Sequence, residues 1–194
     1  MLSRRTFIKS ALATNVAMLA TPSQALQLFI NNDKSKPLLV FADSSALNST
    51  TFMSTVKEQS ARITLDIGQH FDLLKKFCVE SPNGQVAGLT RDSDFFVLEQ
   101  VAKDFGFYPH YSAIHSYNNN TLTHEVTAAQ EPAEIITSSL VNAQENWPTW
   151  LADNMQKLPR SSDKIMTKKS QLTVSNTQKH DYLVSWSFSA SENI

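Results

Sequence analysis

The chain has 194 residues, of which 41% are hydrophobic and only 18% are charged. This length suits one globular domain, and the apolar fraction excludes a disordered or collagen-like chain. With 17 Lys and Arg against 18 Asp and Glu, the formal charge is −1, so there is no electrostatic footprint of a nucleic-acid-binding protein. The single cysteine, Cys78, excludes an internal disulfide framework, and we expect it in the core.

The N-terminus has the three parts of a secretory signal: a basic start, a short apolar middle and small residues before a cleavage point. The middle, residues 10–20, contains Thr14 and Asn15. It is too short and too polar to cross the ~30 Å hydrocarbon core of a bilayer, so we expect no permanent membrane span. Pro22 and the spacing of Ser23 and Ala25 favour cleavage after Ala25 over an amphipathic helix that stays on the protein.

The basic start resembles the twin-arginine signal, whose consensus is Ser/Thr-Arg-Arg-x-Phe-Leu-Lys. The matching residues are Ser3, Arg4, Arg5, Phe7 and Lys9, with Ile8 in the place of the leucine. The resemblance covers only the first 25 residues. It implies export of a folded protein to the periplasm by the twin-arginine translocase, and it raises the hypothesis of a cofactor inserted before export. The sequence itself names no cofactor.

Cleavage after Ala25 changes the size and charge of the protein. Removing 25 of the 194 residues leaves 169. The signal takes three of the 17 basic residues and none of the 18 acidic ones, so the net charge becomes −4.

Three successive pairs of a strand and a helix are predicted between residues 37 and 106. The strands are expected at 37–42, 61–67 and 85–89, and the helices at 51–59, from 69 onward and at 92–105. Asp92 or Ser93 is predicted to cap the third helix, and Gly106 to end it. Right-handed connections between such pairs produce a parallel sheet.

The second half favours antiparallel strands. A hairpin is predicted from 108–117 and 121–128 around Asn118, Asn119 and Asn120, followed by helices from Pro132 to Asn142 and from Pro148 to Lys157. Segments 172–174 and 182–188 predict a second hairpin. The expected fold is one three-layer α/β domain, residues 26–194, with a mostly parallel central sheet and antiparallel hairpin additions in the C-terminal half.

Polar side chains follow each of the three predicted parallel strands, where α/β proteins bind ligands. The candidate ligand or catalytic residues are Asp43, Ser45, Asp66, Arg91 and Asp92. Their carboxylates suit a hard cation such as Mg²⁺ or Ca²⁺, or a cationic or polyhydroxyl ligand. Taken separately, Asp43 and Asp92 are better explained as helix caps. Asp66 lies in an apolar run and needs a partner, for which Arg91 or Arg62 is available.

Two histidines fall near each other across the first predicted hairpin. His115 and His124 are four and five residues from Asn119, close to cross-strand neighbours. They are candidate metal ligands with Glu125 or a strand-end aspartate as the third, although half-exposed sheet histidines give the same pattern. His115 also joins the candidate catalytic set. The segment 147–150, with tryptophans at both ends, suits either an aromatic platform for a sugar or partner, or a plug of the core.

No complete catalytic or nucleotide-binding motif occurs, since Gly-x-Gly-x-x-Gly, Gly-x4-Gly-Lys-Ser/Thr and Gly-x-Ser-x-Gly are all absent from the sequence. The first hypothesis is therefore an exported, non-catalytic binding or accessory module for an envelope complex. The alternative is a small metal-assisted or acid–base hydrolase that uses Asp43, Asp66, Arg91, Asp92 and His115 at the strand ends.

Overall fold

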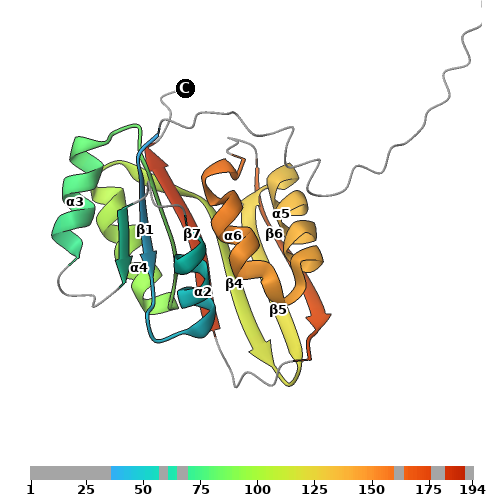
Figure 1. Ribbon diagram of the computed structural model, residues 1–194. Coiled ribbons are helices and arrows are strands. Elements are labelled where there is room, and N and C mark those ends of the chain that lie inside the picture. Colours follow the sequence, from blue (N-terminus) through green and yellow to red (C-terminus); the bar gives the residue numbers. More distant parts are fainter. Residues whose placement is uncertain (1–35, 57–60, 65–69, 160–163, 176–181, 191–194) are drawn as a thin grey trace, which may run out of the picture.

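A computed structural model describes residues 36–56, 61–64, 70–159, 164–175 and 182–190. Within this part of the chain, seven strands form one sheet in the order β2-β1-β3-β7-β4-β5-β6 (Figure 1). In chain order the elements are β1 (Leu38–Ala42), α2 (Leu47–Thr55), β2 (Ala61–Thr64), α3 (Phe71–Glu80), β3 (Gln85–Thr90), α4 (Asp92–Asp104), β4 (Phe107–Asn118), β5 (Thr121–Ala129), α5 (Gln130–Ala143), α6 (Trp147–Asn154), β6 (Ile165–Thr173) and β7 (Tyr182–Ala190). Short 3₁₀ turns at Gln144–Asn146 and Met155–Lys157 flank α6.

The parallel core predicted from the first half is confirmed. β1 pairs in parallel with β2 on one side and with β3 on the other. Every side chain of β1 and β3 is buried, as expected for continuous apolar runs covered on both faces. The first hairpin is also confirmed, because β4 and β5 pair antiparallel around a turn in which Asn119 and Asn120 have positive φ angles.

The mixed α/β class is correct, but a mostly parallel sheet is wrong. Four of the six strand pairings are antiparallel: β3 with β7, β7 with β4, β4 with β5, and β5 with β6. The three-layer arrangement is not supported across the sheet either. α3 and α4 cover one face at its parallel end, whereas α2, α5 and α6 lie on the opposite face (Figure 1). Over β5 and β6, the described helices pack from one side only.

The second predicted hairpin is wrong. β6 pairs with β5 at the edge of the sheet, whereas β7 lies in the middle of it, between β3 and β4. The burial patterns give the physical reason. β6 alternates exposed and half-buried residues along its whole length, while β7 is buried on both faces from Leu183 to Ser189. At the centre of the sheet, β7 contributes side chains to the hydrophobic clusters on both faces. This burial outweighs the tendency of successive strands to pair.

Several helix boundaries also differ from the sequence prediction. α2 begins at Leu47, four residues earlier than expected. α4 begins at Asp92 as predicted, but Arg91 is its N-cap residue, and no side chain makes the capping hydrogen bond. Gly106 has φ 78° and follows the end of α4, which confirms the predicted helix stop. The signal segment and Asp66 lie outside the described residues.

Two hydrophobic clusters lie on opposite faces of the sheet. The first joins α3 and α4 to β1, β3 and β7, and it contains Cys78, as predicted. At its centre Phe41 and Trp186 have ring centroids 6.0 Å apart, and Phe188 stacks on Trp186 at 4.5 Å. Gly88 is required beside them, because a Cβ atom there would lie 2.5 Å from the Trp186 ring. The second cluster lies under α2, α5 and α6.

Candidate functional site

The carboxyl ends of β1 and β3 form the point where the strand order reverses, since the chain leaves β1 toward β2 and returns on the other side as β3. Three predicted site residues meet here. Arg91 Nε donates to Asp43 Oδ2 at 2.8 Å, and the backbone N and the Oγ of Ser45 donate to Asp43 Oδ1 at 2.7 and 2.6 Å. Arg91 Nη2 also reaches Ser45 Oγ at 3.3 Å.

The loop that carries Asp43 is fixed to β3. The Asp43 backbone N donates to Ser49 Oγ at 2.8 Å, and Ser49 Oγ in turn donates to the Leu89 carbonyl. Burial raises the pKa of the Asp43 carboxyl, but the hydrogen bonds from Ser45 and the charge of Arg91 outweigh burial and lower it overall. Asp43 is therefore an anion that already accepts three hydrogen bonds from protein donors.

The other predicted site residues do not join this ion pair. Asp92 is exposed in the first turn of α4, and Asp66 lies outside the described residues. Asp94, which the sequence analysis did not select, is buried in the same turn. Burial and the nearby charge of Asp43 raise the pKa of its carboxyl. Among the described residues, no group of three or more His, Cys, Asp or Glu side chains is arranged to hold a metal ion.

His115 belongs to a separate, buried cluster. The register of the β4–β5 hairpin places it directly opposite His124, and the two Nδ1 atoms are 2.7 Å apart. His115 Nε2 lies 2.7 Å from Ser185 Oγ on β7, and Ser185 Oγ lies 2.6 Å from the Tyr111 hydroxyl. These four side chains form a continuous hydrogen-bonded chain across three strands, with no more than 1% of any of them exposed.

The hydrogen-bonded chain can be polarised in two directions. In one, Tyr111 donates to Ser185, Ser185 to His115, and His115 Nδ1–H to His124 Nδ1. In the other, every bond is reversed, and His124 Nε2 carries a lone pair instead of a proton. The two Nδ1 atoms are hydrogen-bonded to each other. In this arrangement they therefore do not form a metal site with two histidine ligands.

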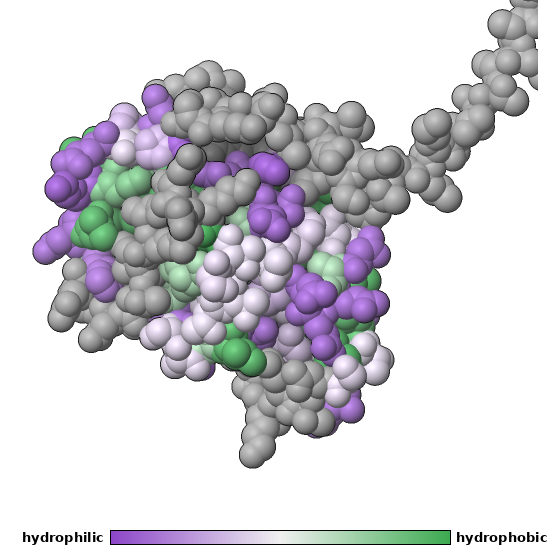
Figure 2. Space-filling view, in the orientation of Figure 1, coloured by the Kyte–Doolittle hydropathy of each residue, from purple (hydrophilic) through white to green (hydrophobic). Residues whose placement is uncertain are grey.

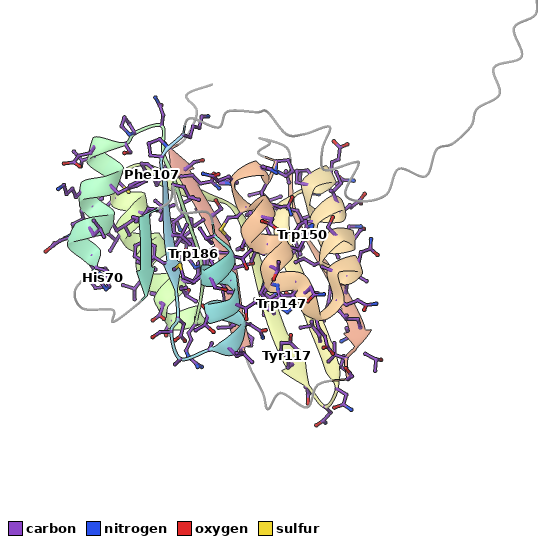
Figure 3. All side chains as sticks on the ribbon, in the orientation of Figure 1. His70, Phe107, Tyr117, Trp147, Trp150 and Trp186 are labelled. Carbon is purple, nitrogen blue, oxygen red and sulfur yellow. The ribbon has the colours of Figure 1, made fainter. Side chains whose placement is uncertain are left out.

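Trp147 covers the histidine pair. Its indole stacks on the His115 ring, with centroids 4.0 Å apart and planes 17° apart, and meets His124 edge-on. Its Nε1 donates to the Tyr117 hydroxyl at 3.0 Å, and both residues lie where α6 crosses β4 (Figure 3). Since Trp147 is fully buried, it plugs the core and is not an exposed aromatic platform.

His124 Nε2, at the outer end of the chain, is buried without a hydrogen-bond partner, and so is the Oγ of Ser170, its cross-strand neighbour on β6. Ser139 Oγ on α5 is also buried without a partner. Burial lowers the pKa of His124 to about 4. Burial, and then repulsion from His124, lower the pKa of His115 well below its ordinary value. Both histidines are therefore neutral at pH 7.

Most of this cluster was not predicted from the sequence. His115 and His124 were predicted as neighbours, but Tyr111, Ser185 and Trp147 were not predicted as their partners. The serines that alternate with larger residues along 182–189 are the one feature of the sequence that points to this cluster. A serine that faces a hairpin carrying histidines can be their hydrogen-bond partner. The signal becomes informative only once β7 is known to lie beside β4.

A groove of about 280 Å³ opens on the surface between α2 and α6. Its lining includes Leu47, Thr51, Glu145 and Pro148, together with Tyr117, which accepts the hydrogen bond from Trp147. Figure 2 shows pale, weakly polar residues over this part of the surface. The groove combines apolar groups, from Leu47 and Pro148, with neutral polar groups and one carboxylate, a composition that suits a partner with both apolar and polar groups.

No helix in the described ranges combines the length and apolar character needed to cross a membrane. Comparison of the chain with protein-family models, with curated proteins and with solved structures finds no match.

Proposed function

We propose that the twin-arginine translocase exports this chain to the periplasm, and that the mature domain acts there as a non-catalytic binding or accessory module of an envelope complex. The segment Ser3 to Lys9 and the small residues before Ala25 support export. One structural observation supports the non-catalytic role. The candidate acid–base groups are bound to the protein itself, Asp43 by Arg91 and Ser45, and His115 by His124 and Ser185.

A general base must reach a substrate proton with a free lone pair. Asp43 uses one carboxylate oxygen for Arg91 and the other for two donors of Ser45. His115 is 1% exposed under Trp147. Asp43 is engaged by Arg91 and Ser45 and His115 is buried, which supports the exposed surface, including the groove between α2 and α6, as the better candidate for function.

Export is tested by replacing Arg4 and Arg5 with Lys in the full-length chain. The double variant keeps the charge but lacks the paired arginines, so we expect the uncleaved precursor to stay in the cytoplasm. The wild-type protein should appear in the periplasm with Leu26 as its first residue. A Ser3→Thr variant, which stays within the consensus, serves as the matched control. Normal periplasmic accumulation of the double-lysine variant would refute the twin-arginine assignment.

The accessory role is tested by native mass spectrometry of the protein purified from its own periplasm. We expect the mass of a heteromeric complex that contains the 169-residue chain and no tightly bound metal. A cofactor inserted before export would appear in the same spectrum as added mass. A monomer that carries nothing, at concentrations that match the cell, would contradict the accessory role.

The hydrolase alternative has one observation in its favour, because Asp43, Ser45 and Arg91 meet where α/β proteins bind ligands. The wild-type protein is assayed with p-nitrophenyl acetate and p-nitrophenyl phosphate, with and without Mg²⁺. Turnover that Arg91→Ala abolishes while the circular dichroism spectrum is unchanged would establish the hydrolase. Equal background rates for both proteins support the binding module.

A further inference from the structure

The His115–His124 pair is two ionisable groups buried in contact, beneath the helix that covers them. Each ring touches the other and Trp147, the first residue of α6. Neither histidine has an ion-pair partner among the described residues. Three of the four ring nitrogens of the neutral pair are hydrogen-bonded, and the pair has no anion to compensate an added proton.

The polar and titratable groups on the elements packed around the pair are uncharged or already paired. They are Tyr111 and Tyr117 on β4, Ser170 and Lys168 on β6, Ser185 on β7, Ser139 and Glu134 on α5, and Trp147 on α6. Lys168 and Glu134 bind each other at 3.0 Å. Glu145, in the turn before α6, accepts hydrogen bonds from the backbone N and the Oγ of Ser175.

The added proton has an identifiable site. When His124 Nδ1–H donates to His115, the lone pair of His124 Nε2 has no partner, and the hydroxyl of Ser170, the cross-strand neighbour of His124, is also buried without one. Protonation there places a cation among hydroxyls and aromatic rings. The face of Trp147 attracts a cation, but this attraction is smaller than the cost of burying an uncompensated charge.

We propose that the His115–His124 pair is an acid-sensitive latch that holds α6 on the sheet. The neutral pair accepts the stacked Trp147 and keeps α6 closed, and protonation loosens α6 before the rest of the domain unfolds. α6 responds first because its Trp147 contacts both rings and anchors the helix through Tyr117. The parallel end of the sheet lies outside this contact. The latch is independent of where the protein is located and of its partners.

The expected pH range follows from the two pKa directions. The unfolded chain takes up protons below the ordinary histidine pKa of about 6.5, whereas the folded pair resists them. Stability is therefore complete above that pH and falls as the pH drops toward 4, where His124 titrates in the folded protein. Each histidine raises the unfolding equilibrium constant by about tenfold per pH unit in this window.

The test is hydrogen exchange of backbone amides in the intact wild-type protein at pH 7 and pH 5, corrected for intrinsic exchange rates. We expect protection of residues 147–154 in α6 to fall at least tenfold more than protection of residues 92–104 in α4. An equal change in the two helices would overturn the latch. A second measurement needs no variant: NMR titration should show His115 and His124 still neutral at pH 5.5. A normal pKa near 6.5 for either ring would overturn the proposal as well.

A variant isolates the pair from the other histidines. In His115→Gln/His124→Leu the selective loss of α6 protection should disappear, while His70→Gln, a change outside the cluster, should leave it intact. If the double variant folds and α6 still loosens selectively at pH 5, the latch is wrong. If it does not fold, the exchange and titration data on the wild type decide the question.

Discussion

The two ends of the sheet fill their cores in different ways. The parallel end, β2-β1-β3 with α3 and α4, is packed with aliphatic and aromatic side chains such as Phe41 and Trp186. The antiparallel end, β4-β5-β6 under α5 and α6, buries a hydrogen-bonded chain of Tyr111, His115 and His124. An apolar core buries few polar atoms that need hydrogen bonds. In a buried polar chain, each hydrogen bond that is lost leaves an unsatisfied polar group and lowers the free energy of unfolding.

β7 belongs to both ends, because its two faces differ. Val184, Trp186 and Phe188 point into the apolar cluster beneath α3 and α4. On the other face, Ser185 binds Tyr111 and His115, and Ser187 accepts a hydrogen bond from Gln85 Nε2 at 2.6 Å. One strand of alternating large and small residues therefore completes two cores of opposite character.

The largest expected effect comes from breaking the apolar end. Trp186→Ala removes a fully buried ring and its Nε1 hydrogen bond to Thr90 Oγ1. We expect a loss of about 3–5 kcal/mol in the free energy of unfolding, measured by urea denaturation at pH 7. Phe96→Ala on α4 is the control, because Phe96 is 61% exposed and should change stability by less than about 0.5 kcal/mol. Similar losses for both variants would contradict the core assignment.

An intermediate effect is expected at the polar end. Ser185→Ala deletes one small atom but leaves Tyr111 and His115 without their shared partner. The expected loss is about 1–3 kcal/mol, the cost of unsatisfied buried polar groups. Ser112→Ala, on the opposite and half-exposed face of β4, is the matched control. Equal stability of the two variants in urea would show that the hydrogen-bonded chain contributes nothing.

The smallest effect is expected at the strand-end ion pair. Asp43→Asn should cost about 1 kcal/mol at pH 7, because Arg91 is half exposed and water screens part of its attraction. The pKa of the Asp43 carboxyl is lowered in the folded protein, so its contribution is present above an ordinary aspartate pKa of about 4 and is lost as the pH falls further. Urea denaturation at pH 7 and pH 3 measures the difference, which should shrink at pH 3. A constant difference would contradict an ionic role.

The parallel end was predictable from local patterns. Continuous apolar runs such as Leu38–Ala42 and the glycine stop at Gly106 are encoded within a few residues. The antiparallel end was predictable only in part. The asparagine turn predicted the β4–β5 hairpin and therefore the histidine pair. The position of β7 was not predictable, because it depends on pairing with β3, almost a hundred residues away, and local alternation does not name a partner.

The candidate site shows the same limit. Asp43, Ser45 and Arg91 were found because residues at strand ends can be read from the strands that precede them. Trp147 and Ser185 were not connected to His115, because α6 and β7 reach it from distant parts of the chain. The prediction that Asp92 caps α4 was wrong, because Arg91 occupies the N-cap position.

The central place of β7 has a consequence for the order in which the protein is made. β7 begins only at Tyr182, yet it lies between β3 and β4, so the two halves of the sheet cannot be joined until this segment has been made. The two pairings that join the halves, β3 with β7 and β7 with β4, wait for this late segment, which favours slow completion of the fold. An export pathway that transports only folded proteins would allow β7 to insert between β3 and β4 before export.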